Sequence, residues 1–99
     1  MDVTVLENPD THRYEAVDGT GTVVGFVEYV DRRDTRLLVH AEVDPSSEGQ
    51  GIGSTLAREV LDQAVATGRD TGLAVRVTCP FIVNWLEEHP DYADKVTVG

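Results

Sequence analysis

The sequence predicts an α/β (α+β) domain with a mixed, mainly antiparallel sheet and one parallel strand–helix–strand crossover. Short β-leaning runs joined by turn residues fill the first 43 positions, and one long amphipathic helix pattern follows at 51–67. A further strand pattern at 73–77 comes directly after that helix, and this order requires a right-handed parallel crossover. With 99 residues, of which 40% are hydrophobic, we expect a single domain over residues 1–99 with a modest core.

The antiparallel part is expected from the first three runs. Residues 3–6 form a short β-leaning run that ends at the turn signal Asn8-Pro9-Asp10. Residues 13–17 and 22–30 flank Asp18-Gly19, a dipeptide typical of hairpin turns. The run at 22–30 is apolar on both faces, so we predict a central strand there.

The next strand, predicted at 35–43, carries two candidate catalytic residues. Strict alternation would place His40 and Glu42 on one face, ~6.6 Å apart along the strand. Such a pair could take a proton from an incoming amine; the alternative is an ordinary half-exposed polar face. The same alternation gives two sets, Leu37, Val39, Ala41 and Val43 on one face and Arg36, Leu38, His40 and Glu42 on the other.

A glycine-rich loop between this strand and the helix is the strongest functional signal. Its backbone N–H groups, with the positive end of the helix dipole, are typical of a phosphate site. The loop fits neither a Walker loop, which needs a Gly-Lys-Ser/Thr ending, nor a dinucleotide fingerprint. The candidate cofactor-binding residues here are Gly49, Gln50, Gly51, Ile52, Gly53 and Ser54.

The helix at 51–67 is marked by apolar residues at helical spacing, and Gly68 is expected to cap its C-terminus. A second helix is expected to start at Pro80, with Cys79 or Thr78 as its cap, and to stop at Pro90.

Cys79 is a candidate nucleophile. It would lie at the C-terminal end of a parallel strand and the N-terminus of a helix, where ligands bind and thiol reactivity rises. The alternative is a small buried core residue.

Composition excludes several classes of function. The formal net charge of −10 argues against nucleic acid, since phosphate neutralisation needs clustered basic residues. No apolar run approaches the ~18 residues of a membrane helix. The single cysteine excludes an internal disulfide and suits a reducing cytoplasm. No metal cofactor is expected, and the oligomeric state cannot be predicted.

The segment Glu48-Gly49-Gln50-Gly51-Ile52-Gly53 resembles the coenzyme A loop of the GNAT superfamily of acyltransferases, Gln/Arg-x-x-Gly-x-Gly/Ala. It departs from that pattern at Glu48. His40-Ala41-Glu42-Val43, Cys79-Pro80-Phe81 and His89-Pro90-Asp91-Tyr92 resemble minimal GNAT proteins of roughly a hundred residues, which lack the N-terminal helices of larger members.

This resemblance implies that the two parallel strands splay apart to admit acetyl-coenzyme A as co-substrate. It also implies a thioester carbonyl polarised by backbone N–H near Val43. Larger members often use a tyrosine on the last helix as general acid, but no tyrosine lies within 81–89. That role is therefore vacant or moves to Cys79 or Tyr92.

Two functions follow as hypotheses. The first is an acetyl-coenzyme A-dependent N-acetyltransferase acting on an unidentified small-molecule or protein amine, with His40 or Glu42 as base. The amine attacks directly, or an acetyl-Cys79 intermediate forms. The second is a non-catalytic module that binds coenzyme A or a partner.

Overall fold

Four antiparallel strands in chain order make up the first part of the sheet. The structure is a computed structural model that describes residues 2–47, 49 and 51–99. The strands are β1 (Thr4–Asn8), β2 (Arg13–Val17), β3 (Val23–Arg32) and β4 (Thr35–Val43). Each pairs with the next in antiparallel register, which confirms the expected antiparallel half of the sheet.

A single long helix, α1 (Ile52–Thr71), then carries the chain back to β5 (Ala74–Val77), which lies parallel to β4. A short 3₁₀ turn, η1 (Pro45–Ser47), comes between β4 and the glycine loop. After β5 the chain forms α2 (Pro80–Glu87), α3 (Pro90–Ala93) and a two-residue strand, β6 (Thr97–Val98). β6 pairs in parallel with β5, an addition to the sheet that the sequence pattern did not predict.

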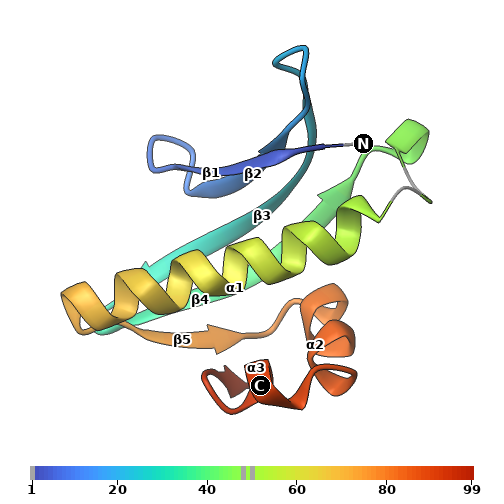
Figure 1. Ribbon diagram of the computed structural model, residues 1–99. Helices are drawn as coiled ribbons and strands as arrows, with labels where there is room; N and C mark the ends of the chain where they lie inside the picture. Colours follow the sequence, from blue (N-terminus) through green and yellow to red (C-terminus); the bar gives the residue numbers. More distant parts are fainter. Residues whose placement is uncertain (1, 48, 50) are drawn as a thin grey trace.

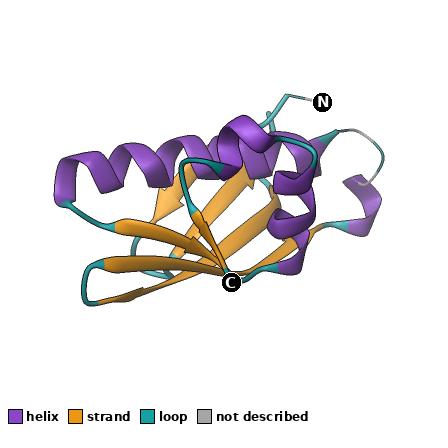
Figure 2. Ribbon diagram, turned by 90° about the horizontal axis from the view of Figure 1, so that it is seen from below, coloured by secondary structure: helices purple, strands orange, loops and turns teal. Residues whose placement is uncertain are grey.

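The core lies between α1 and one face of the sheet. Figure 2 shows α1 across that face, and within the described residues no helix covers the opposite face. Tyr14 and Ala16 of β2, Val27 of β3 and Leu38 of β4 point into this core and are fully buried. α1 contributes a stripe with helical spacing, Ile52, Leu56, Ala57, Val60, Leu61 and Ala64, as the periodicity predicted.

The helix α1 is longer than the sequence suggested, and its predicted cap was wrong. Gly72, with φ 82°, ends the helix, and its N–H donates to the carbonyl of Gly68 at 2.8 Å. Gly68 lies inside the last turns instead. A Cβ there would lie 2.3 Å from the carbonyl oxygen of Leu73, so close packing with the following strand explains this glycine.

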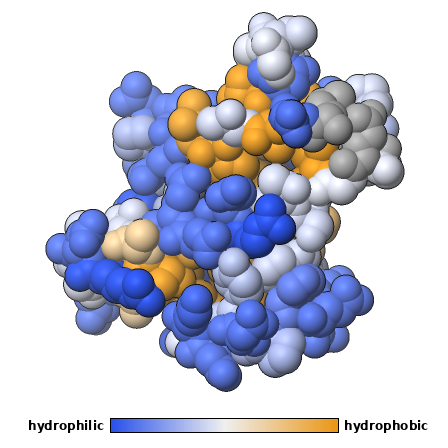
Figure 3. Space-filling model, in the orientation of Figure 1, coloured by the Kyte–Doolittle hydropathy of each residue, from blue (hydrophilic) through white to orange (hydrophobic). Residues whose placement is uncertain are grey.

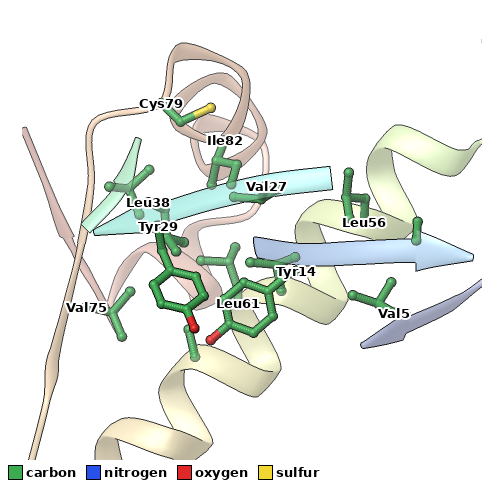
Figure 4. Close-up of a cluster of buried hydrophobic side chains, with 14 of the residues drawn as sticks. Val5, Tyr14, Val27, Tyr29, Leu38, Leu56, Leu61, Val75, Cys79 and Ile82 are labelled. Carbon is green, nitrogen blue, oxygen red and sulfur yellow. The ribbon is translucent and has the colours of Figure 1, made fainter. Parts of the chain in front are cut away.

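A buried arginine network closes one end of the core. Arg36 binds Asp31 through two hydrogen bonds, Nε to Oδ1 at 2.7 Å and Nη2 to Oδ2 at 2.8 Å. Its Nη1 donates to the Tyr14 hydroxyl at 2.9 Å, and its guanidinium lies over the Tyr29 ring. Figure 4 shows the two tyrosine rings side by side. Hydrogen bonds from Arg36 hold the pKa of Asp31 below its usual range, and the Tyr29 hydroxyl donates to Glu7.

Polar residues cover much of the molecule as seen in Figure 3, with an apolar area in the upper half of the view and a smaller one below it.

No helix among the described residues is long and apolar enough to cross a membrane.

Candidate acyl-transfer site

The strands β4 and β5 part after a short stretch of pairing. Their parallel register runs only from Thr35 opposite Ala74 to Leu38 opposite Val77. The Leu38 carbonyl then accepts hydrogen bonds from the N–H groups of Thr78 and Cys79, both at 3.0 Å, as the chain turns into α2. From Val39 onward, β4 therefore has β3 on one side and, within the described residues, no strand on the other.

A β-bulge at Val39 separates the two parts of β4. Tyr29 of β3 lies opposite Leu38, whereas the next residue back, Glu28, lies opposite His40, so Val39 has no direct partner. The predicted strict alternation was therefore wrong. Before the bulge the buried positions are Arg36 and Leu38; after it Ala41 and Val43 pack against the core.

His40 and Glu42 lie side by side on the uncovered face of the sheet, as predicted. His40 Nε2 is 3.5 Å from Glu42 Oε1, and 52% and 61% of the two side chains are exposed. The His40 ring also lies 6.2 Å, centroid to centroid, from the Phe26 ring. Both side chains are therefore accessible to a ligand on this face.

A cavity of about 750 Å³ lies at the C-terminal end of β4, beside Glu42. Its walls come from β3, the end of β4, the following turn and Phe81 of α2. Arg13 also lines it, with its guanidinium 4.0 Å from the centre of the Phe26 ring and 3.7 Å from Glu28. Of the predicted site residues that the structure describes, Glu42 and Val43 line this cavity.

The glycine loop lies next along the chain, although Glu48 and Gln50 fall outside the described residues. Gly49 and Gly51 both have positive φ, 83° and 76°, and Gly51 stands at the N-cap of α1. The first helical hydrogen bond runs from Thr55 N–H to the Gly51 carbonyl. The N–H groups of residues 52–54 therefore have no acceptor within the helix. No acidic side chain lies in the first turn, which leaves this end of the helix favourable to an anion.

The side chains of this first turn differ in what they can offer a ligand. Ile52 is buried in the core, so only its backbone is available. A Cβ on Gly53 would lie 2.9 Å from Cζ of Phe81 and 3.9 Å from a methyl group of Val43. Phe81 therefore packs against the start of α1 and lines the cavity together with Val43. Ser54 is exposed and accepts a hydrogen bond from Trp85 Nε1 at 2.9 Å.

Asp44 braces the turn between β4 and the loop. Its carboxylate accepts hydrogen bonds from the backbone N–H and the hydroxyl of Ser46, at 2.9 and 2.8 Å, which lower the pKa of Asp44. Its own N–H donates to the Val24 carbonyl at 2.7 Å.

Cys79 stands at the N-cap of α2, as predicted, but its side chain makes no capping hydrogen bond and is only 1% exposed. Figure 4 shows it beside Ile82 in the cluster of buried side chains. The structure therefore places the thiol in the core, apart from the residues that line the cavity.

The sequence did not indicate the role of Trp85. The indole is half-buried against the core, and its N–H donates to the Ser54 hydroxyl, 31 positions earlier. Its ring stacks on His89 with centroids 3.7 Å apart, and Tyr92 meets it edge-on at 5.1 Å. The signals available were the spacing of Trp85 and His89 and the need of an indole N–H for an acceptor.

Comparison with known proteins identifies the family. The family model described as GCN5-related N-acetyl-transferase matches residues 13–95. The solution NMR structure of a GCN5-like protein from Staphylococcus aureus shares the fold, with a TM-score of 0.66 at 18% identity over 97% of this chain and 89% of that one. A search of curated proteins found no match. Among the described residues there is no group of three or more side chains that could hold a metal. The chain therefore belongs to the GCN5-related N-acetyltransferase family.

Proposed function

We propose that this protein transfers an acetyl group from acetyl-coenzyme A to an amine. The observation that carries the proposal is the free C-terminal part of β4, from Val39 to Val43, which lies between a cavity and the N-terminus of α1. Coenzyme A would place its diphosphate against the N–H groups of residues 52–54 and its thioester along the free edge of β4.

The residues at the end of β4 supply the chemistry. The amine nitrogen attacks the thioester carbonyl carbon, and a main-chain N–H near Val43 stabilises the oxygen as negative charge develops on it. His40, oriented by Glu42, takes the proton that the amine loses. The carbon–sulfur bond then breaks, and coenzyme A leaves as a thiolate that takes a proton from water.

Direct attack by the amine is supported over an acetyl-Cys79 intermediate because the Cys79 side chain is buried. Under direct attack, Cys79→Ala keeps most of the turnover and loses about 1 kcal/mol of unfolding free energy, as for other small buried groups. Mass spectrometry after incubation with acetyl-coenzyme A then shows no hydroxylamine-sensitive adduct. An adduct that Cys79→Ala abolishes, together with turnover, would establish the covalent route.

The placement of the tyrosines favours a second candidate, a module that binds coenzyme A without turnover. Tyr14 and Tyr29 are buried in the arginine network. Tyr92 packs against Trp85 and lies beside Asp62; partial desolvation and this carboxylate raise its pKa. No described tyrosine lines the cavity as a proton donor to the leaving thiolate. Thiol release from acetyl-coenzyme A with a panel of amines decides between the two: turnover above background excludes the binding module.

Binding can be tested separately with two matched glycines. Gly51 and Gly72 cap opposite ends of α1 with nearly the same φ, 76° and 82°, and at each a Cβ would meet no described atom within 4 Å. Alanine at either position should lower the free energy of unfolding by about 1 kcal/mol, because a residue with a Cβ is strained in the left-handed conformation. Coenzyme A at about 100 times its Kd should stabilise the native protein by ~2.7 kcal/mol.

We expect Gly72→Ala to keep this ligand-induced gain and Gly51→Ala to lose at least half of it, measured by thermal unfolding. If both variants lose the stabilisation by coenzyme A, or if neither does, coenzyme A does not bind at the N-terminus of α1. No gain with the native protein at millimolar coenzyme A would overturn the proposed function.

A further inference from the structure

The hydrogen bond between Trp85 and Ser54 limits the directions in which the Ser54 hydroxyl hydrogen can point. An indole N–H can only donate, so the Ser54 oxygen is the acceptor of the 2.9 Å bond. The hydroxyl hydrogen of Ser54 must then point to another group. In a helix the usual acceptor is a carbonyl one turn earlier, but among the described residues no carbonyl accepts the Ser54 hydroxyl, which is exposed. The hydrogen can therefore be donated to a ligand in front of the first turn of α1.

Two contacts to the indole ring and one to the main chain hold Trp85 in place for this bond. Its ring lies nearly parallel to the His89 imidazole, with an interplanar angle of 9°. His89 Nδ1 donates to the Trp85 carbonyl at 2.7 Å, since a carbonyl oxygen can only accept. Tyr92 contacts the indole edge-on at 76°. The segment around Pro90 thus sets the orientation of a side chain that reaches the start of α1.

We propose that Trp85 is a positioning residue that aims the Ser54 hydroxyl at a phosphate oxygen bound at the N-terminus of α1. This inference rests on the proposed function, because the phosphate is that of coenzyme A. The main-chain N–H groups there have fixed directions, whereas a free serine hydroxyl rotates among several acceptors. By occupying one lone pair of Ser54, Trp85 leaves its hydrogen poised for the anion before the ligand arrives.

The test compares Trp85→Phe, which keeps an aromatic ring against His89 and Tyr92 but loses the donor, with Ser54→Ala and the double variant. The dissociation constant of coenzyme A should rise roughly threefold in Trp85→Phe, because the hydroxyl is then free to rotate among its three staggered positions. Ser54→Ala should raise it roughly tenfold, the loss expected for one hydrogen bond to a charged group. The double variant should be no weaker than Ser54→Ala, because the tryptophan acts only through the serine.

A phosphate-free thioester, S-acetylpantetheine, supplies the control for a merely structural effect. Its kcat/KM should be the same in the native protein and in Trp85→Phe, since it lacks the group that Ser54 contacts. Trp85 is the only tryptophan in the sequence, so its indole N–H gives a single NMR resonance. That resonance should shift in Ser54→Ala, and it should shift in the native protein when coenzyme A is added.

An unchanged coenzyme A affinity in Trp85→Phe would overturn the inference. So would additive losses in the double variant, or an equal loss with S-acetylpantetheine. In each of these outcomes the native protein still binds coenzyme A. If the proposed function is wrong, the native protein itself binds no coenzyme A.

Discussion

The two parts of β4 differ in almost every physical respect. Before the bulge at Val39 the strand is paired on both sides, and its inward side chains, Arg36 and Leu38, are buried in the core. After the bulge the strand is paired on one side only within the described residues, and it exposes His40 and Glu42. One strand therefore contributes stability with its first part and a candidate site with its second.

The difference shows how a chain of 99 residues can leave part of one strand paired on a single side, within the described residues, and keep its fold. An unpaired stretch of strand weakens a sheet and invites wrong pairing. Here the cost is confined to residues 39–43, while the arginine network and the paired residues 35–38 hold the same strand firmly. Substitutions in the first part should thus change stability, and those in the second part should change turnover.

The largest expected effect on stability is that of Leu38→Ala. Leu38 is completely buried, and removing a buried leucine side chain costs about 3 kcal/mol through lost burial and the cavity left behind. Urea unfolding should show the loss, while turnover per folded molecule stays near the native value. A cost below ~1 kcal/mol would contradict the assignment of this part of β4 to the core.

A smaller loss, about 2 kcal/mol, is expected for Arg36→Ala. The substitution leaves the Tyr14 hydroxyl and the Asp31 carboxylate without their partner, and the partial exposure of Asp31 moderates the cost. Urea unfolding at neutral pH gives the magnitude.

The pH dependence of the stability lost in Arg36→Ala tests whether the pairing with Asp31 is its cause. The pKa of Asp31 is lowered in the folded protein, so its pairing contributes stability above the unfolded value of about 3.9. That contribution is lost as the pH falls through the lower folded pKa. The gap between the native protein and Arg36→Ala should therefore narrow below about pH 3.9, and a gap that widened there would exclude the Asp31 pairing as its origin.

The smallest effect on stability is expected for His40→Gln, within about 0.5 kcal/mol, because the side chain is exposed. If His40 is the base, kcat/KM should nevertheless fall roughly a hundredfold. Glu42→Gln is the matched variant and should lower turnover less, since it only orients His40. Full turnover in His40→Gln would show that His40 is not the base and that the pair is an ordinary polar face of the strand.

Much of the fold could be predicted because its signals are local. The apolar period of α1, the turn residues between the first strands and Pro80 at the start of α2 each act within a few positions. The expected juxtaposition of His40 and Glu42 also depended only on a two-residue spacing, and the bulge left it intact.

The misplaced features depend on contacts between distant segments. Val39 is apolar in an apolar run, so nothing in the sequence marks it as the bulged residue. Arg36 is buried because Glu7, Tyr14 and Asp31 come from three other strands to meet it. Gly68 and Gly72 are both reasonable caps in the sequence, and the structure ends the helix at Gly72.

The brief pairing of β5 has a consequence for motion. This strand is joined to β4 through four residue pairs and to β6 through two, whereas β3 and β4 share eight. Local opening should therefore begin at β6, which has the fewest pairs, and should reach β3 and β4 last. We expect the amide hydrogens of β6 to exchange with solvent faster than those of the paired residues of β3 and β4.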